Sequence, residues 1–140
     1  MFRPAIVLAV AMLTGACAES PDVDSSAAGL AGSEWRPLEI GGEAPASSEA
    51  MFVAFGGDGL LHGHGGCNAF SGGYESEGNS LSVTPLAATR MACPEPAMTD
   101  ENAFLAALQG STAFVREGAG LTLLDGQGDV AARVAQTDWD

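Results

Sequence analysis

The chain has 140 residues, a formal net charge of −13 and no lysine, so every basic side chain is an arginine. This length allows one ordinary domain with appendages. Such an acidic surface repels phosphate backbones, and the composition therefore excludes a nucleic-acid partner. The acidic residues are spread along the chain, which is typical of a solvated surface.

The first residues predict an export signal. Arg3 supplies a positive start, and an apolar run follows from Ala5 to Leu13. The run is shorter than the roughly 20 residues that a helix needs to span a bilayer. It has the length of the apolar region of a secretory signal. We predict that residues 1–16 form a lipoprotein-type signal peptide.

The end of this signal allows two interpretations. Small residues 14–16 precede Cys17 and resemble the lipobox of bacterial lipoproteins, although Thr14 stands where leucine is commonest. The resemblance implies that Cys17 carries lipid, including palmitate, and that Ala18 after it directs the protein to the outer membrane, facing the periplasm. The alternative is cleavage after Ala18, which would release a soluble periplasmic protein.

The residues after the signal predict a flexible tether. Residues 17–32 are small, polar and acidic, and they show no periodicity. They cannot bury enough apolar area to order themselves. We expect the folded domain to occupy residues 33–140.

The rest of the chain predicts about eight short strands and one helix. Apolar or alternating stretches bounded by glycine turns are typical of strands. They occur at 35–40, 50–55, 60–76 with glycine breaks, 80–86, 87–93, 112–117, 120–125 and 129–135. The fold class expected is α+β, with a mostly antiparallel sheet that curls into a barrel and a helix that covers one opening.

The predicted helix follows the sequence Pro-Glu-Pro and ends at Gly110. Thr99 is its expected N-cap, with Asp100 and Glu101 in the first turn, where the helix dipole favours negative charge. Phe104 and Leu108 share one apolar face, which should turn towards the sheet.

Three cysteines suggest one disulfide. If Cys17 carries lipid, Cys67 and Cys93 remain, and an oxidising compartment favours their pairing. A bridged cysteine is no longer a thiolate, so this pairing weakens any metal site or nucleophile built on Cys67.

The motifs Gly66–Gly72, "GCNAFSG", and Thr89–Cys93, "TRMAC", resemble the META domain of HslJ-like heat-shock and envelope proteins. The resemblance extends from Trp35 to about Val134. It implies a small exported protein, often a lipoprotein, linked to stress response and drug tolerance. It implies no established catalytic activity.

Two histidines near this motif suggest a metal site. His62 and His64 are separated by one residue, so on a strand both side chains lie on one face and could bind copper or zinc. Cys67 or Asp58 could supply a third ligand. The alternative is that both histidines simply face solvent.

Asn68, Thr89 and Arg90 are candidate structural or ligand-contacting residues of the motif. Asn68 can bond the backbone of a tight turn. Arg90 is expected to pair with a carboxylate or backbone carbonyls, and anion binding is the alternative. No set of nucleophile, acid and base can be assembled, so we expect no enzyme and no cofactor.

The function expected from the sequence is therefore a non-enzymatic, lipid-anchored envelope protein that binds a partner under stress. Its contacts would be the membrane, through the lipid, and an unidentified envelope protein or small ligand. The alternative is a periplasmic metal-binding protein that uses His62 and His64.

Overall fold

The computed structural model describes residues 29–137, and these form nine strands, a short 3-10 helix and an α-helix. The elements are β1 (Ser33–Ile40), the 3-10 helix (Ser48–Ala50), β2 (Met51–Phe55), β3 (Leu60–Gly65), β4 (Ala69–Glu77), β5 (Ser80–Val83), β6 (Ala87–Ala88), α2 (Ala97–Gly110), β7 (Ser111–Glu117), β8 (Gly120–Asp125) and β9 (Val130–Gln136).

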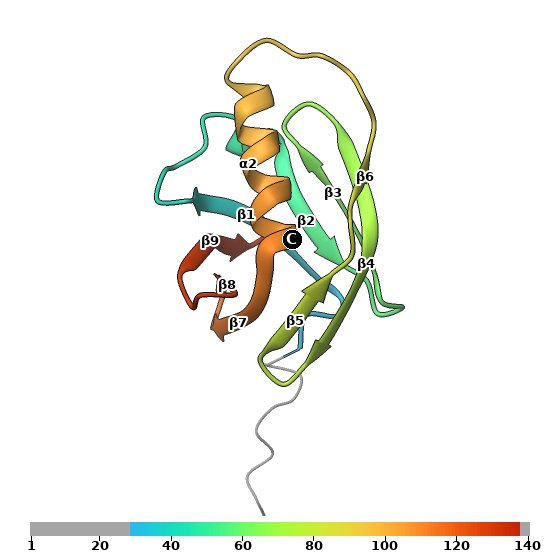
Figure 1. The fold of residues 1–140 in the computed structure, drawn as a ribbon, viewed down its shortest axis with the longest axis vertical. Coiled ribbons are helices and arrows are strands. Elements are labelled where there is room, and N and C mark those ends of the chain that lie inside the picture. Colours follow the sequence, from blue (N-terminus) through green and yellow to red (C-terminus); the bar gives the residue numbers. More distant parts are fainter. Residues whose placement is uncertain (1–28, 138–140) are drawn as a thin grey trace, which may run out of the picture.

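The strands form one antiparallel barrel. The pairing order is β3-β2-β1-β9-β8-β7-β5-β4, and an additional pairing between β3 and β4 closes the ring. The two-residue strand β6 lies outside the ring, beside β4. Figure 1 shows the curled sheet with α2 packed across its opening. The predicted α+β fold with a barrel-like sheet is therefore confirmed.

The core lies inside the barrel because alternate residues of each strand point inward. In β2, for example, Met51, Val53 and Phe55 are buried while the residues between them are only half-buried. The helix contributes Phe104 and Leu108, both completely buried. Phe104 meets Phe70 of β4 edge-on, with ring centroids 5.9 Å apart, which fixes α2 against the sheet.

The helix begins earlier than predicted, so Thr99 is not its N-cap. α2 starts at Ala97, after Pro96. The carboxylate of Glu95 accepts bonds from the Thr99 backbone N–H at 3.1 Å and from its hydroxyl at 2.6 Å. An acidic side chain upstream of the helix therefore satisfies one of the free N–H groups of its first turn, that of Thr99 itself.

The chain already packs against the barrel before β1. Leu30 is completely buried, and Arg116 donates to the Gly29 carbonyl at 2.7 Å while its guanidinium lies 5.1 Å from the Trp35 ring centre. The predicted signal peptide, Cys17 and most of the predicted tether lie outside the described residues. Within residues 29–137 no helix is long and apolar enough to cross a membrane.

Candidate functional site

The pattern "HGHG" in β3 alternates between the two faces of the barrel wall. Gly63 and Gly65 are buried, whereas His62 is exposed and His64 half-buried. A Cβ at Gly63 would lie 2.2 Å from the Phe52 carbonyl oxygen, and one at Gly65 would lie 2.4 Å from Cγ of Glu101. Both inner positions therefore require glycine because no side chain fits there.

The two histidines share the outer face, as predicted for a strand, but each contacts the protein. Nδ1 of His64 lies 2.9 Å from the Ala50 carbonyl oxygen and 3.1 Å from the Gly66 nitrogen. His62 meets Phe52 edge-on at 6.0 Å. Across residues 29–137 no group of three or more histidine, cysteine, aspartate or glutamate side chains could hold a metal.

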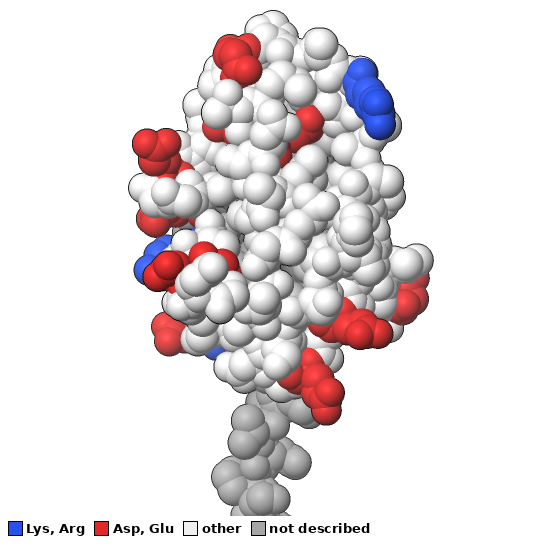
Figure 2. All heavy atoms as spheres, in the orientation of Figure 1, with Lys and Arg blue, Asp and Glu red and all other residues white. Residues whose placement is uncertain are grey.

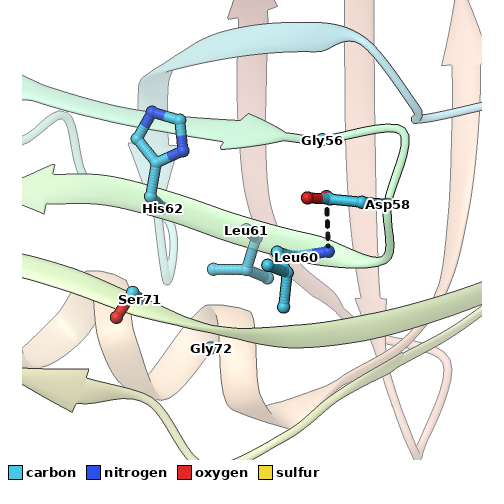
Figure 3. A pocket seen from close by; sticks show the side chains of 7 residues that line it. All are labelled: Gly56, Asp58, Leu60, Leu61, His62, Ser71 and Gly72. Carbon is cyan, nitrogen blue, oxygen red and sulfur yellow. Dashed lines mark hydrogen bonds between the residues drawn. The ribbon is translucent and has the colours of Figure 1, made fainter.

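His62 lines a shallow pocket of about 470 Å³ together with Asp58 and Ser71. Figure 3 shows the Asp58 carboxylate turned towards the backbone nitrogen of Leu60, whose N–H it accepts at 3.1 Å. Asp58 therefore stabilises the β2–β3 turn. The third ligands considered from the sequence, Asp58 and Cys67, are engaged in this turn and in a disulfide respectively.

Cys67 and Cys93 form the disulfide predicted from the sequence, with Cα atoms 5.9 Å apart. It joins the β3–β4 turn to the segment that precedes α2. The bridge thus holds the two sequence motifs, Gly66–Gly72 and Thr89–Cys93, side by side.

A buried carboxylate organises the same turn. Glu101 is 3% exposed. Its Oε1 accepts the backbone N–H groups of Cys67, at 3.3 Å, and Asn68, and its Oε2 accepts Nδ2 of Asn68 at 2.7 Å. Three donors therefore converge on one carboxylate, which compensates its burial.

Asn68 connects Glu101 to the second motif. Its Nδ2 also donates to the Met91 carbonyl at 3.1 Å, and its Oδ1 accepts the Met91 N–H at 2.7 Å and the Thr89 hydroxyl at 2.9 Å. Both amide protons and both lone pairs of Oδ1 are then used. Asn68 and Thr89 therefore build the structure, and the Asn68 amide has no bond left for a ligand.

These contacts form the floor of a second pocket, of about 410 Å³, between residues 86–92 and residues 98–105 of α2. A volume of this size lies within the range of small-ligand clefts. The lining combines apolar side chains with a polar floor and one cation: Asn68, Leu86, Ala88, Thr89, Arg90, Met91, Ala92, Met98, Glu101, Asn102 and Leu105.

Arg90 departs from the expectation of structural pairing. It is exposed, and within residues 29–137 its guanidinium makes no hydrogen bond or ion pair. The carboxylate in the same pocket lining, that of Glu101, is instead bonded to the N–H groups of Cys67 and Asn68. The arginine is thus available at the pocket's rim for an anionic group.

Sequence reasoning missed Glu101 as a site residue. It was assigned only a favourable place in the first turn, but it lies three residues before Phe104 and seven before Leu108, on the same face of the helix. That spacing could have indicated that Glu101 faces the core together with Phe104 and Leu108.

The family model described as "META domain" matches residues 28–138. The chain belongs to the META domain family. The match covers both motifs, the disulfide, Glu101 and the pocket, so these features belong to the META domain of this chain. No curated protein matches the chain.

Solved structures share the fold of this META domain at low sequence identity. A protein from Burkholderia xenovorans, determined by NMR, is 23% identical with a TM-score of 0.65, covering 99% of this chain and 100% of that chain. A crystal structure of a DUF4847 family protein from Bacteroides vulgatus is 14% identical with a TM-score of 0.61, covering 79% of this chain and 96% of that one. These likenesses concern the fold alone.

Proposed function

We propose that this META domain protein is a non-enzymatic, lipid-anchored protein of the cell envelope that binds a partner through the pocket between residues 86–92 and α2. The lipobox-like Cys17 and the short apolar run before it support anchoring. The oxidised pair Cys67–Cys93 agrees with an oxidising, extracytoplasmic location.

One observation supports the binding role: the polar groups around this pocket are already bonded within the protein. Asn68 and Glu101 are engaged with the turn, and Cys67 is bridged. Catalysis needs a nucleophile or a base that is free to reach substrate. The pocket instead offers apolar side chains and the exposed Arg90, which are features of a binding surface.

Complementation of a strain that lacks the chain tests this proposal. Under envelope stress, such as detergent or antibiotic, the wild-type protein should restore survival. Cys17→Ser should fail, because serine has no thiol to carry the lipid anchor. Leu105→Glu together with Arg90→Ala should also fail, because the pair alters both the apolar wall and the cation. Arg133→Ala, which changes an exposed arginine on β9, is the matched control and should complement.

Pocket variants that are present at normal levels and complement fully would contradict the binding role. Full complementation by Cys17→Ser would contradict the need for the anchor. The alternative of metal binding by His62 and His64 remains a prediction; retention of zinc or copper by the wild type but not by His62→Ala/His64→Ala would support it.

A further inference from the structure

The wall of the pocket formed by residues 86–92 is the unpaired edge of a strand. β6 pairs with β4 on one side, with Phe70 opposite Ala88 and Ser71 opposite Ala87. The pairing continues beyond β6, because the Thr89 N–H donates to the Ala69 carbonyl at 3.0 Å. The segment therefore keeps extended pairing geometry past its two assigned residues.

The backbone groups on this strand alternate between two sides. The N–H groups of Thr89 and Met91 point towards β4 and Asn68. Successive N–H groups of an extended chain point in opposite directions, so those of Ala88 and Arg90 point towards α2. Leu86 shows this directly, because its N–H donates to Oε1 of Gln109 near the end of α2 at 3.0 Å.

The opposite wall of the pocket is the helix. Met98, Glu101, Asn102 and Leu105 line it along α2, facing the strand edge. In Figure 1, α2 and the chain leading from β6 run alongside each other, and they meet in the loop at the top. A groove between a free strand edge and a helix is a site where an extended peptide can add a strand.

The charges define the peptide. Arg90 is the basic side chain in the lining, and Glu101 is the acidic one, with its carboxylate already bonded to three N–H groups. On the face in Figure 2 the surface between α2 and β6 is mostly uncharged, and acidic side chains are more frequent elsewhere. A partner with a carboxylate beside apolar side chains would match Arg90 and the walls formed by Leu86 and Leu105.

We propose that the pocket takes an extended peptide segment of a partner protein, which pairs with the edge at Ala88 and Arg90 and places a carboxylate beside Arg90. This inference rests on the proposed binding function and names its ligand class. The peptide would satisfy the backbone groups of the strand edge, and Met91, which is 58% exposed, would be covered on binding.

The test uses the exported protein in detergent micelles and its amide NMR spectrum. The probe is the acetylated peptide Thr-Val-Thr-Val-Asp with a free carboxyl end. Before the peptide is added, the amides of Ala88 and Arg90 should exchange with solvent faster than those of Thr89 and Met91. On titration, the first pair should shift and become protected from exchange.

Three controls make the outcome specific. The same peptide with N-methyl groups at alternate residues, on the edge that would pair, should not bind. Replacement of Asp by Lys, with an amidated end, should weaken binding. Arg90→Ala should weaken binding of the acidic peptide roughly two- to fivefold, the effect of an exposed ion pair, whereas Arg133→Ala should not.

Slow exchange at Ala88 and Arg90 in the free protein would overturn the inference, because the strand edge would already be paired. Absence of binding by the acidic peptide, or equal binding by its N-methylated form, would also overturn it. None of these results affects lipid attachment or complementation, so failure of strand addition is distinguishable from failure of the anchored binding function.

Discussion

Glu101 is the residue on which the candidate site depends. Its carboxylate accepts three N–H donors from the β3–β4 turn, and it is 3% exposed. The sequence placed it correctly on the helix. It could not show that the helix begins at Ala97 and turns this position inward onto the turn beside the disulfide. That arrangement depends on how β3, β4 and α2 pack together.

Glu101→Ala should destabilise the protein by about 3 kcal/mol, because it leaves buried N–H groups of Cys67 and Asn68 without acceptors. Urea unfolding measures this change. Glu117→Ala, at an exposed position at the end of β7, is the control and should stay within about 0.5 kcal/mol of the wild type. Equal unfolding midpoints for both variants would show that the carboxylate does not hold the turn.

Gly63→Ala should also be strongly destabilising, by about 2–3 kcal/mol, because the added Cβ would lie 2.2 Å from the Phe52 carbonyl oxygen and 2.5 Å from the Phe70 ring. Gly57→Ala is the matched control, since nothing lies within 4 Å of its Cβ position. Thermal unfolding compares the two variants. A Gly63→Ala protein as stable as Gly57→Ala would mean that β3 does not approach β2 and β4 this closely.

Tyr74 should make stability fall at alkaline pH. Burial, and secondarily the negative charge of Asp58, raise the pKa of Tyr74 above its ordinary value. The unfolded chain then loses the phenol proton at a lower pH than the folded protein. The contribution of Tyr74 to the free energy of unfolding is therefore fully present below about pH 10 and is lost as pH rises through the folded pKa. Tyr74→Phe should remove this part of the pH dependence.

The absorbance of tyrosinate measures this pKa directly, because Tyr74 is the only tyrosine of the chain. Asp58→Asn should lower the pKa of Tyr74 by removing the nearby negative charge. The Tyr74 hydroxyl donates to the Gly56 carbonyl at the β2–β3 turn, and an ordinary pKa in the wild-type protein, unchanged in Asp58→Asn, would contradict the burial of the phenol there.

At the scale of elements, the disulfide joins the β3–β4 turn to the segment between β6 and α2. Strand pairing alone would hold that segment weakly. β6 has only two residues, and the extended chain from Thr89 to Cys93 continues it with a single backbone bond to β4, that of the Thr89 N–H. This segment is held by Asn68, by the Thr89 N–H bond to β4 and by the bridge between Cys67 and Cys93. The bridge therefore stabilises one wall of the pocket.

Replacing both Cys67 and Cys93 by alanine should cost about 3.5 kcal/mol, the chain-entropy estimate for the 26-residue separation. The urea midpoint of the wild type should fall on addition of dithiothreitol, and the double variant should not respond. A wild-type midpoint that is insensitive to complete reduction would contradict this stabilising role.

Strand positions and fold class could be predicted because alternating apolar residues and glycine turns are local signals. The bounds of β7, β8 and β9 agree with the predicted ranges to within one residue at each end. The helix start could not, because Glu95 acts as the cap from outside the expected motif. Likewise Arg90 was expected to pair with a carboxylate or carbonyls, but it is exposed, and the buried carboxylate of Glu101 is bonded to Asn68 and Cys67 instead.

At the scale of the whole molecule, the first described residues and the loop before α2 lie at opposite ends of the barrel. In Figure 1 the first described residues lie at the bottom of the barrel, while the loop before α2 lies at the top. An anchor upstream of Gly29 would therefore join the barrel at the end opposite the loop before α2. The net charge of −13 would also favour distance from anionic headgroups.

The most direct test of the central claim is the intact mass of the exported protein under non-reducing conditions, after alkylation of free thiols. We predict a chain that begins at Cys17, carries acyl and diacylglyceryl groups, lacks two hydrogen atoms and bears no alkyl label. A mass that corresponds to a chain starting after Ala18 and carrying no lipid would contradict the anchor. Alkyl labels on Cys67 and Cys93 would contradict the bridge that joins the two motifs.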